Sequence, residues 1–296
     1  FQAEDGIRDR SPSRGLGDVY KRQTDLVVRR LLIDLESPVQ RHWCGGDAFR
    51  SAFFGALSMS FPIGEQFFID SVRAGLKALP PEQQARFKDE AQGFIGQEAT
   101  HRRVHALFNE QIQQHGLVND WEPRARKRLA LITSLDPRHG LAITAANEHF
   151  TALFAEWMLS HPECLDGTEP RLKTLWLWHS AEEAEHKCTA FDLYQALGGS
   201  EHWRLKWMRR VTVIFLFDTL RQTLNNLQRD GTLWRWSTWT SAARFLFGPQ
   251  GMIRASIKPW RAWFQNGFHP AQQHSTLSEN WLRENASAYS IVGQRA

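Results

Sequence analysis

Four glutamates, two of them followed three residues later by a histidine, constrain this chain more than any other feature. In chain order they are Glu65, Glu98-x-x-His101, Glu148 and Glu183-x-x-His186. Residues three or four apart share one face of an α-helix, so each Glu-x-x-His pair points a carboxylate and an imidazole the same way. Each interval between successive glutamates suits one long helix and a turn. The pattern therefore predicts a four-helix bundle whose core binds two metal ions.

The sequence around these glutamates favours metal ligands over ordinary ion pairs. Ala, Phe and Ile surround them, so they are expected to be buried, and buried carboxylates are very costly unless cations neutralise them. The alternative is a set of buried Glu–Arg pairs. Arg102 and Arg103 could serve one glutamate, but Glu65 and Glu148 have no basic residue nearby in sequence. Two divalent metal ions are the preferred interpretation.

A further histidine, His179, lies one helical turn before Glu183 and on the same face. His179 is predicted to be a seventh ligand, and two alternatives stay open: it only hydrogen-bonds to a ligand, or it is an exposed helix residue. His105 and His149 are interpreted as packing or hydrogen-bonding residues. Glu182 and Glu185 point off the predicted ligand face, so they are expected to be solvated or paired with Lys187. No residue is assigned a catalytic role.

Proline, glycine and capping residues divide the chain into helices. Long helices are predicted at about 47–79, 81–116, 137–160 and 169–197, with a shorter crossover helix at about 122–134. Pro62 predicts a kink just before Glu65. We predict a metal-binding helical bundle over 24–200 and a helical extension over 201–296 packed on it. Residues 1–23 resemble translated sequencing-adapter read-through and are interpreted as a non-native or disordered tail.

The predicted extension differs in composition from the rest of the chain. Residues 201–296 carry 13 Lys/Arg against 5 Asp/Glu, and eight of the 13 tryptophans. A fifth long helix is expected from Glu201, followed by short helices separated by Gly231, Gly248-Pro249, Pro259 and Pro270. Basic residues with tryptophan are typical of a membrane interface, so peripheral membrane contact is a second interpretation beside simple packing. No nucleic-acid partner is predicted, because the basic residues are dispersed and follow no known motif.

The cysteine content and the hydropathy of the chain indicate its cellular compartment. Three cysteines without a Cys-x-x-Cys pair make a disulfide framework or zinc ribbon unfavourable. The longest predominantly apolar run, Val211 to Phe217 with Thr212 inside it, is far shorter than the ~18 residues of a membrane span. A cytoplasmic protein is expected, and whether it also associates with a membrane stays open.

The alternating glutamates over about 47–200 resemble the ferritin-like di-iron carboxylate superfamily, which implies an all-α, ferritin-like four-helix bundle. The His-x-x-x-Glu-x-x-His arrangement of 179, 183 and 186 resembles arylamine N-oxygenases, such as p-aminobenzoate N-oxygenase. The whole chain from about residue 30, including PIGEQFF, EEAEHK and NGFHP, is most similar to a bacterial family called predicted metal-dependent hydrolases.

The predicted function is O₂-dependent oxidation of a small apolar organic substrate at a site holding two iron ions, with Mn/Fe or another divalent pair as alternatives. Carboxylates with a few imidazoles suit such metals, and an electron-donor protein is an expected partner. Phenylalanines near the ligands suggest an apolar pocket: Phe67, Phe68, Phe94 and Phe150. Two other functions stay open, a dinuclear metal-dependent hydrolase and a ferroxidase-like iron-handling protein.

Overall fold

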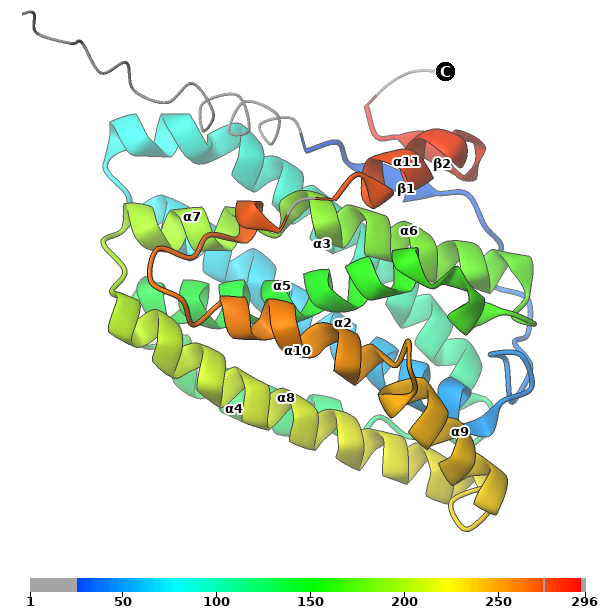
Figure 1. Ribbon diagram of the computed structural model, residues 1–296. Helices are drawn as coiled ribbons and strands as arrows, with labels where there is room; N and C mark the ends of the chain where they lie inside the picture. Colours follow the sequence, from blue (N-terminus) through cyan, green and yellow to red (C-terminus); the bar gives the residue numbers. More distant parts are fainter. Residues whose placement is uncertain (1–25, 274, 294–296) are drawn as a thin grey trace, which may run out of the picture.

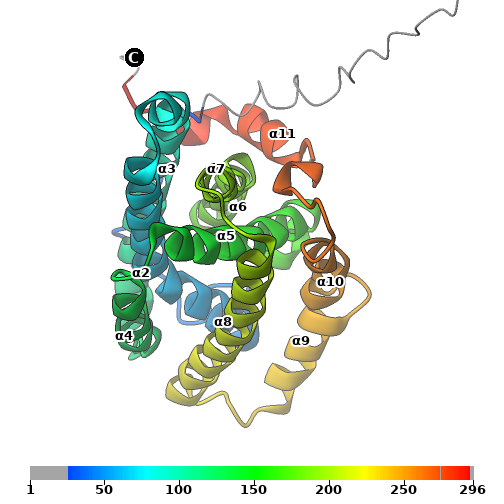
Figure 2. The same cartoon turned by 90° about the vertical axis from the view of Figure 1, so that its left-hand side faces the viewer.

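The computed structural model describes residues 26–273 and 275–293, and it confirms the predicted all-α helical bundle. The predicted metal ligands lie on four helices, which are labelled in Figure 1. They are α2 (Ala48–Ala78), α3 (Pro81–Gln113), α5 (Pro137–Ser160) and α6 (Pro170–His186). Helix α3 packs on α2, α2 on α5 and α5 on α6, and α6 returns to contact α3 (Figure 2). The four helices thereby enclose a common core.

Local sequence signals account for where these helices begin. The side chain of Asp47 accepts a hydrogen bond from the backbone N–H of Arg50, which caps α2. Proline occupies the first position of α3, α5 and α6, where no intrahelical N–H is needed. Helix α2 runs through Pro62 without interruption. The crossover α4 (Trp121–Ile132) packs against α2.

The helix that carries Glu183 ends earlier than predicted. Instead of reaching Leu197, it stops at His186, and α7 (Thr189–Ala196) begins after a two-residue turn. Lys187 and Cys188 keep right-handed helical backbone angles, so the chain continues in nearly the same direction. The interruption therefore lies directly after the last predicted ligand.

The C-terminal helices pack on the outside of the bundle. Helix α8 (Glu201–Asp230) packs on α2 and α5 and ends at Gly231, whose φ of 74° favours glycine. Helices α9 (Trp236–Phe247), α10 (Met252–Ala262) and α11 (Leu277–Glu284) follow. The predicted break at Pro259 is wrong, because α10 continues through it. The hydrogen bond that this proline removes would reach the carbonyl of Ala255, which is exposed and accessible to water.

A short antiparallel ribbon joins the two ends of the described chain. Strand β1 (Arg29–Leu31) pairs with β2 (Tyr289–Ile291), with Arg30 opposite Ser290. The predicted tail, residues 1–23, lies outside the described residues. No helix in the described part of the chain is long and apolar enough to cross a membrane.

One carboxyl group outside the metal site should make stability depend on pH. Burial between α3 and α7 raises the pKa of Glu90 from 4.5 to about 7. The folded state therefore keeps a proton that the unfolded chain loses above pH 4.5, so stability falls as pH rises toward 7. The full shift in this pKa corresponds to a decrease of at most ~3 kcal/mol in the free energy of unfolding. We expect Glu90→Gln to raise the melting temperature at pH 8 but not at pH 4.5. An equal change at both pH values would contradict this.

Candidate metal centre

The structure brings six of the seven predicted ligands into two overlapping groups. Within each group, the donor atoms lie within 4.8 Å of one another. The first group contains Glu98, His101, Glu183 and His186, and the second contains Glu65, His101 and His179. Glu148, the seventh, belongs to neither group, but its Oε2 lies 3.0 Å from Nδ1 of His186. Because His101 belongs to both groups, the residues form one continuous cluster between α2, α3, α5 and α6.

The four glutamates of the cluster are buried and nearly devoid of hydrogen bonds. Their exposed fractions lie between 0% and 4%. Seven of their eight carboxylate oxygens have no hydrogen-bond partner among the described residues, and the eighth, Oε1 of Glu183, contacts His179. Unpartnered carboxylates at this depth are strongly unfavourable without a cation. The donor set therefore fits divalent metal ions.

The alternative of buried Glu–Arg pairs is wrong. In the described chain, no Arg or Lys forms an ion pair with the four glutamates of the cluster. Arg102 hydrogen-bonds to Gln66 instead, and Arg103 is exposed. The compensation for burial must come from the histidines, from protons or from bound cations.

The electrostatics of the cluster match a site that exchanges protons for metal ions. Burial raises the pKa values of Glu65 and Glu98 well above their usual range, and it raises the pKa of Glu148 to about 7. Burial alone would also raise the pKa of Glu183, but contacts with His186 and His101 hold it well below the usual range. Without cations, Glu65 and Glu98 thus favour the protonated form and Glu148 is about half protonated at pH 7, so metal binding would displace protons.

His101 is oriented by a buried acidic partner. Its Nε2 donates to Oε2 of Glu182 at 2.9 Å, and Oε1 of Glu182 lies 3.0 Å from a guanidinium nitrogen of Arg29. The other ring nitrogen, Nδ1, makes no hydrogen bond and lies 3.4 Å from Oε1 of Glu183. A carboxylate that holds the outer nitrogen is the usual way to aim a metal-binding histidine. His101 therefore faces the cluster through Nδ1.

The prediction that Glu182 and Glu185 are solvated or paired with Lys187 is wrong. Glu182 is fully buried, and Arg29 from β1 binds both carboxylates. Lys187 instead donates to the carbonyl oxygen of Gln273. Helical spacing could not reveal this network, because Arg29 and Glu182 are separated by 153 positions in sequence.

A chain of hydrogen bonds fixes the tautomer of His179. Nδ2 of Asn109 donates to the carbonyl oxygen of Ser58 at 3.0 Å, so Oδ1 of Asn109 accepts from the Ser58 hydroxyl at 2.7 Å. That hydroxyl then accepts from Nδ1 of His105 at 2.8 Å. Nε2 of His105 therefore carries the lone pair, and it accepts a hydrogen bond from the Nδ1–H group of His179 at 2.6 Å. The lone pair of His179 is consequently on Nε2, which points into the cluster.

This tautomer favours the interpretation of His179 as a ligand. Burial lowers the pKa of His179 to about 4, which keeps the ring neutral as the hydrogen bonds require. Nε2 lies 2.8 Å from Oε1 of Glu183, so two acceptor atoms face each other. Such a contact is stable when a proton or a metal ion lies between the atoms. His149 has a different environment, since it packs against Trp263 and Phe268.

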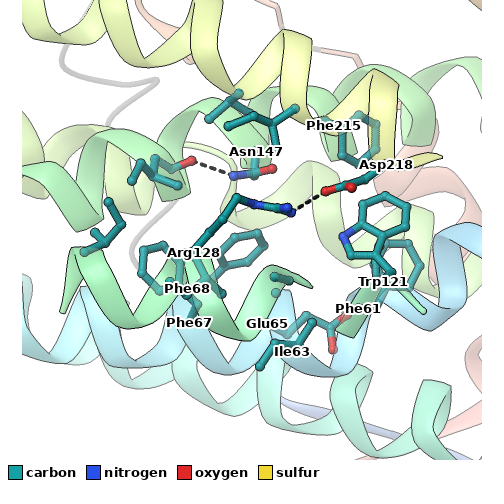
Figure 3. A pocket seen from close by; sticks show the side chains of 18 of the residues that line it. Phe61, Ile63, Glu65, Phe67, Phe68, Trp121, Arg128, Asn147, Phe215 and Asp218 are labelled. Carbon is teal, nitrogen blue, oxygen red and sulfur yellow. Dashed lines mark hydrogen bonds and ion pairs between the residues drawn. The ribbon is translucent and has the colours of Figure 1, made fainter. Parts of the chain in front are cut away.

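An apolar pocket of about 370 Å³ reaches the cluster at Glu65. Helices α2, α4, α5 and α8 form its walls (Figure 3). Besides Glu65, its charged and amide groups are Arg128, which pairs with Asp218, Arg210, and Asn147, which donates to the carbonyl oxygen of Ile143 at 2.8 Å. Of the phenylalanines predicted to line a pocket, Phe67 and Phe68 line this one, and Phe150 lines a separate apolar groove between α8 and α10. The volume and lining are those of a site for a small organic molecule.

A second, smaller cavity touches the cluster from another direction. It has a volume of about 40 Å³ and is lined by both His179 and Glu183. Phe61, Thr151 and Phe215 line this cavity and also the larger pocket. These three side chains therefore separate the larger pocket from the inner face of the cluster. Phe94 does not line the pocket, since its ring packs edge-on against His186.

Comparison with known families agrees with the geometry of the cluster. A family model described as "Predicted metal-dependent hydrolase" matches residues 27–274. The chain belongs to this family. The match includes all seven residues of the cluster and continues from the bundle through α8, α9 and α10. Curated proteins and solved structures yield no match.

The family assignment confirms one of the resemblances seen in the sequence. The description supports an enzyme that depends on metal, and it favours hydrolysis over oxidation. The resemblances to ferritin-like di-iron proteins and to N-oxygenases stay predictions, as does the division of the chain at residue 200.

Proposed function

We propose that this protein is a dinuclear metal-dependent hydrolase that acts on an apolar organic substrate. The observation that carries the proposal is the position of Glu65, whose carboxylate belongs to the buried cluster and also lines the apolar pocket. A substrate in that pocket would lie against the metal site. The proposed ligands of the two ions are Glu65, Glu98, His101, Glu148, His179, Glu183 and His186.

Two divalent ions at this site would supply polarisation of a substrate oxygen and a lowered pKa for water. The protein supplies the surroundings. Phe67 and Phe68 exclude bulk water from the pocket, and Asn147, whose amide nitrogen is already used by Ile143, offers its amide oxygen to a polar group of the substrate. Arg128 and Asp218 both line the pocket, and their ion pair leaves neither of these two charges unpaired.

A second function is O₂-dependent oxidation of the same class of substrate, at a di-iron or Mn/Fe centre reduced by an electron-donor protein. The specific observation in its favour is the donor set, four glutamates and three histidines from four helices, which is close to that of di-iron bundles. Nothing about the apolar pocket distinguishes the two reactions, so the metal and the co-substrate must be tested directly.

The test compares hydrolysis with oxygen consumption in protein that has been stripped by chelator and reloaded. Zn(II), Mn(II) or Fe(II) protein is assayed without oxygen on chromogenic carboxylic esters and phosphoesters with alkyl chains of increasing length. A hydrolase releases product anaerobically, with zinc or manganese sufficient. The proposal fails if no metal supports hydrolysis while reduced iron protein consumes O₂ in proportion to its iron.

Gly64 provides a variant that narrows the pocket without touching the ligands. A Cβ atom at this position would meet only the ring of Phe68, at 3.9 Å, so a larger side chain would extend into the pocket. We expect Gly64→Leu to lower kcat/KM for apolar substrates at least ~10-fold, with metal content unchanged. Gly64→Ala is the matched control and should have a much smaller effect. Equal activity of both variants would mean that substrate binds elsewhere.

A further inference from the structure

Helices α8 and α9 expose large apolar side chains. Both helices lie on the side of the molecule away from α11 (Figure 2). On α8, Val213, Phe217 and Leu220 are 69%, 58% and 56% exposed. Their spacing places them on one face of the helix. At the start of α9, Trp234 and Trp236 are 91% and 81% exposed. A cluster of this kind on a soluble surface usually marks a site of interaction.

An apolar groove of about 640 Å³ opens beside this face, between α8 and the pair α9–α10. Leu216, Trp239 and Ile257 lie on its rim and are themselves exposed. No charged side chain lines it among the described residues. The pocket at Glu65 opens on the other flank of α8, next to the exposed Ile214. The exposed face of α8 thus lies between the mouths of two apolar cavities.

The same segment is strongly basic. Residues 206–261 contain ten Lys/Arg and two Asp. Basic residues from other parts of the chain already pair with both aspartates: Asp218 with Arg124 and Arg128, and Asp230 with Arg41. The positive charge around the apolar side chains is therefore not neutralised by the acids of its own segment.

We propose that the face formed by α8, α9 and α10 binds the surface of an anionic lipid bilayer. Tryptophan and other large apolar side chains surrounded by Lys and Arg are typical of interfacial binding, in which the apolar groups enter the lipid and the cations meet its headgroups. A second copy of the chain fits less well, because a symmetric contact would bring two basic faces together. Nucleic acid fits the charge but leaves the apolar side chains without partners.

Binding in this orientation would turn the mouths of both cavities toward the membrane. Apolar molecules dissolved in the bilayer could then enter without crossing water. Phe215 lines the groove, the pocket at Glu65 and the small cavity at His179, so its ring is the shared wall between them. The binding itself does not depend on which reaction the metal site performs.

The experiment is co-sedimentation of the full chain with vesicles of phosphatidylcholine, with and without phosphatidylglycerol. We expect binding only to the anionic vesicles, weakened by salt. The double substitutions Phe217→Ser with Trp236→Ser, and Arg244→Glu with Arg254→Glu, should each weaken it at least about 10-fold. Leu32→Ser removes a similarly exposed apolar side chain (54%) next to β1 and should have no effect.

Circular dichroism verifies that each variant is folded, and light scattering gives the mass without lipid. Failure to bind anionic vesicles, or binding that the substitutions on α8–α10 do not weaken, would overturn the proposal. So would a stable dimer that Phe217→Ser with Trp236→Ser dissociates, or binding to duplex DNA that is tighter than binding to vesicles.

Discussion

Glu183→Ala is expected to abolish high-affinity metal binding. Oε1 of Glu183 lies 3.4 Å from Nδ1 of His101, 2.8 Å from Nε2 of His179 and 3.8 Å from Nε2 of His186, so this carboxylate contacts all three histidines. Its removal should lower metal affinity by more than the ~10–100-fold typical of residues that only support a ligand. Glu98→Ala should act in the same direction.

The measurement is the difference in melting temperature between metal-loaded and metal-free protein. A ligand at a concentration 100 times its Kd stabilises the folded state by ~2.7 kcal/mol, and this gain should disappear in both variants. Glu110→Ala, an exposed glutamate on the same helix as Glu98, is the control and should keep the full gain. If Glu183→Ala keeps the wild-type difference, Glu183 is not a ligand.

Arg29→Met is expected to cause the largest loss of stability in the metal-free protein. Arg29 is 8% exposed, and its guanidinium group binds Glu182, which is fully buried, and Glu185. Removing one partner of a buried ion pair leaves an uncompensated charge and typically costs ~3–5 kcal/mol. Urea unfolding monitored by circular dichroism measures the free energy of unfolding.

A second substitution separates loss of charge pairing from loss of packing. Glu182→Gln in the Arg29→Met background removes the unpaired charge, so it should restore part of the stability. Because Glu182 also holds Nε2 of His101, the same substitution should weaken metal binding ~10–100-fold. A loss below ~1 kcal/mol in Arg29→Met alone would show that this network contributes little.

The boundaries of the main helices could be predicted because their signals are local. Asp47 caps α2, and prolines begin α3, α5 and α6. The pairing of β1 with β2 could not be predicted, since the two strands are three residues long and come from opposite ends of the chain. The break after His186 carries no glycine or proline to signal it.

The ligands of the candidate site could also be predicted from local sequence, but the residues that orient them could not. Helical spacing selects the seven residues that the fold brings together, because it determines which side chains share a face. It does not identify the groups that orient them. Asn109 and Ser58 fix the tautomer of His179 through His105, and Arg29 holds Glu182 against His101. These contacts join elements that are far apart in sequence, so helical periodicity cannot reveal them.

The types of ligand residue do not determine which reaction the site catalyses. Glutamate and histidine bind iron, manganese and zinc, and a dinuclear pair of any of them can activate water. The predicted oxidation and the proposed hydrolysis therefore use the same seven residues. What separates them is the metal that the site selects and whether O₂ is consumed.

The most direct test of the metal centre is a crystal structure of the metal-loaded protein with diffraction data collected at the absorption edge of the bound metal. We predict two anomalous peaks within the cluster, together with two ions per chain by elemental analysis. The cluster comprises Glu65, Glu98, His101, Glu148, His179, Glu183 and His186. Absence of any peak there in protein soaked with excess Zn(II), Mn(II) or Fe(II), or peaks only at the surface, would contradict this prediction.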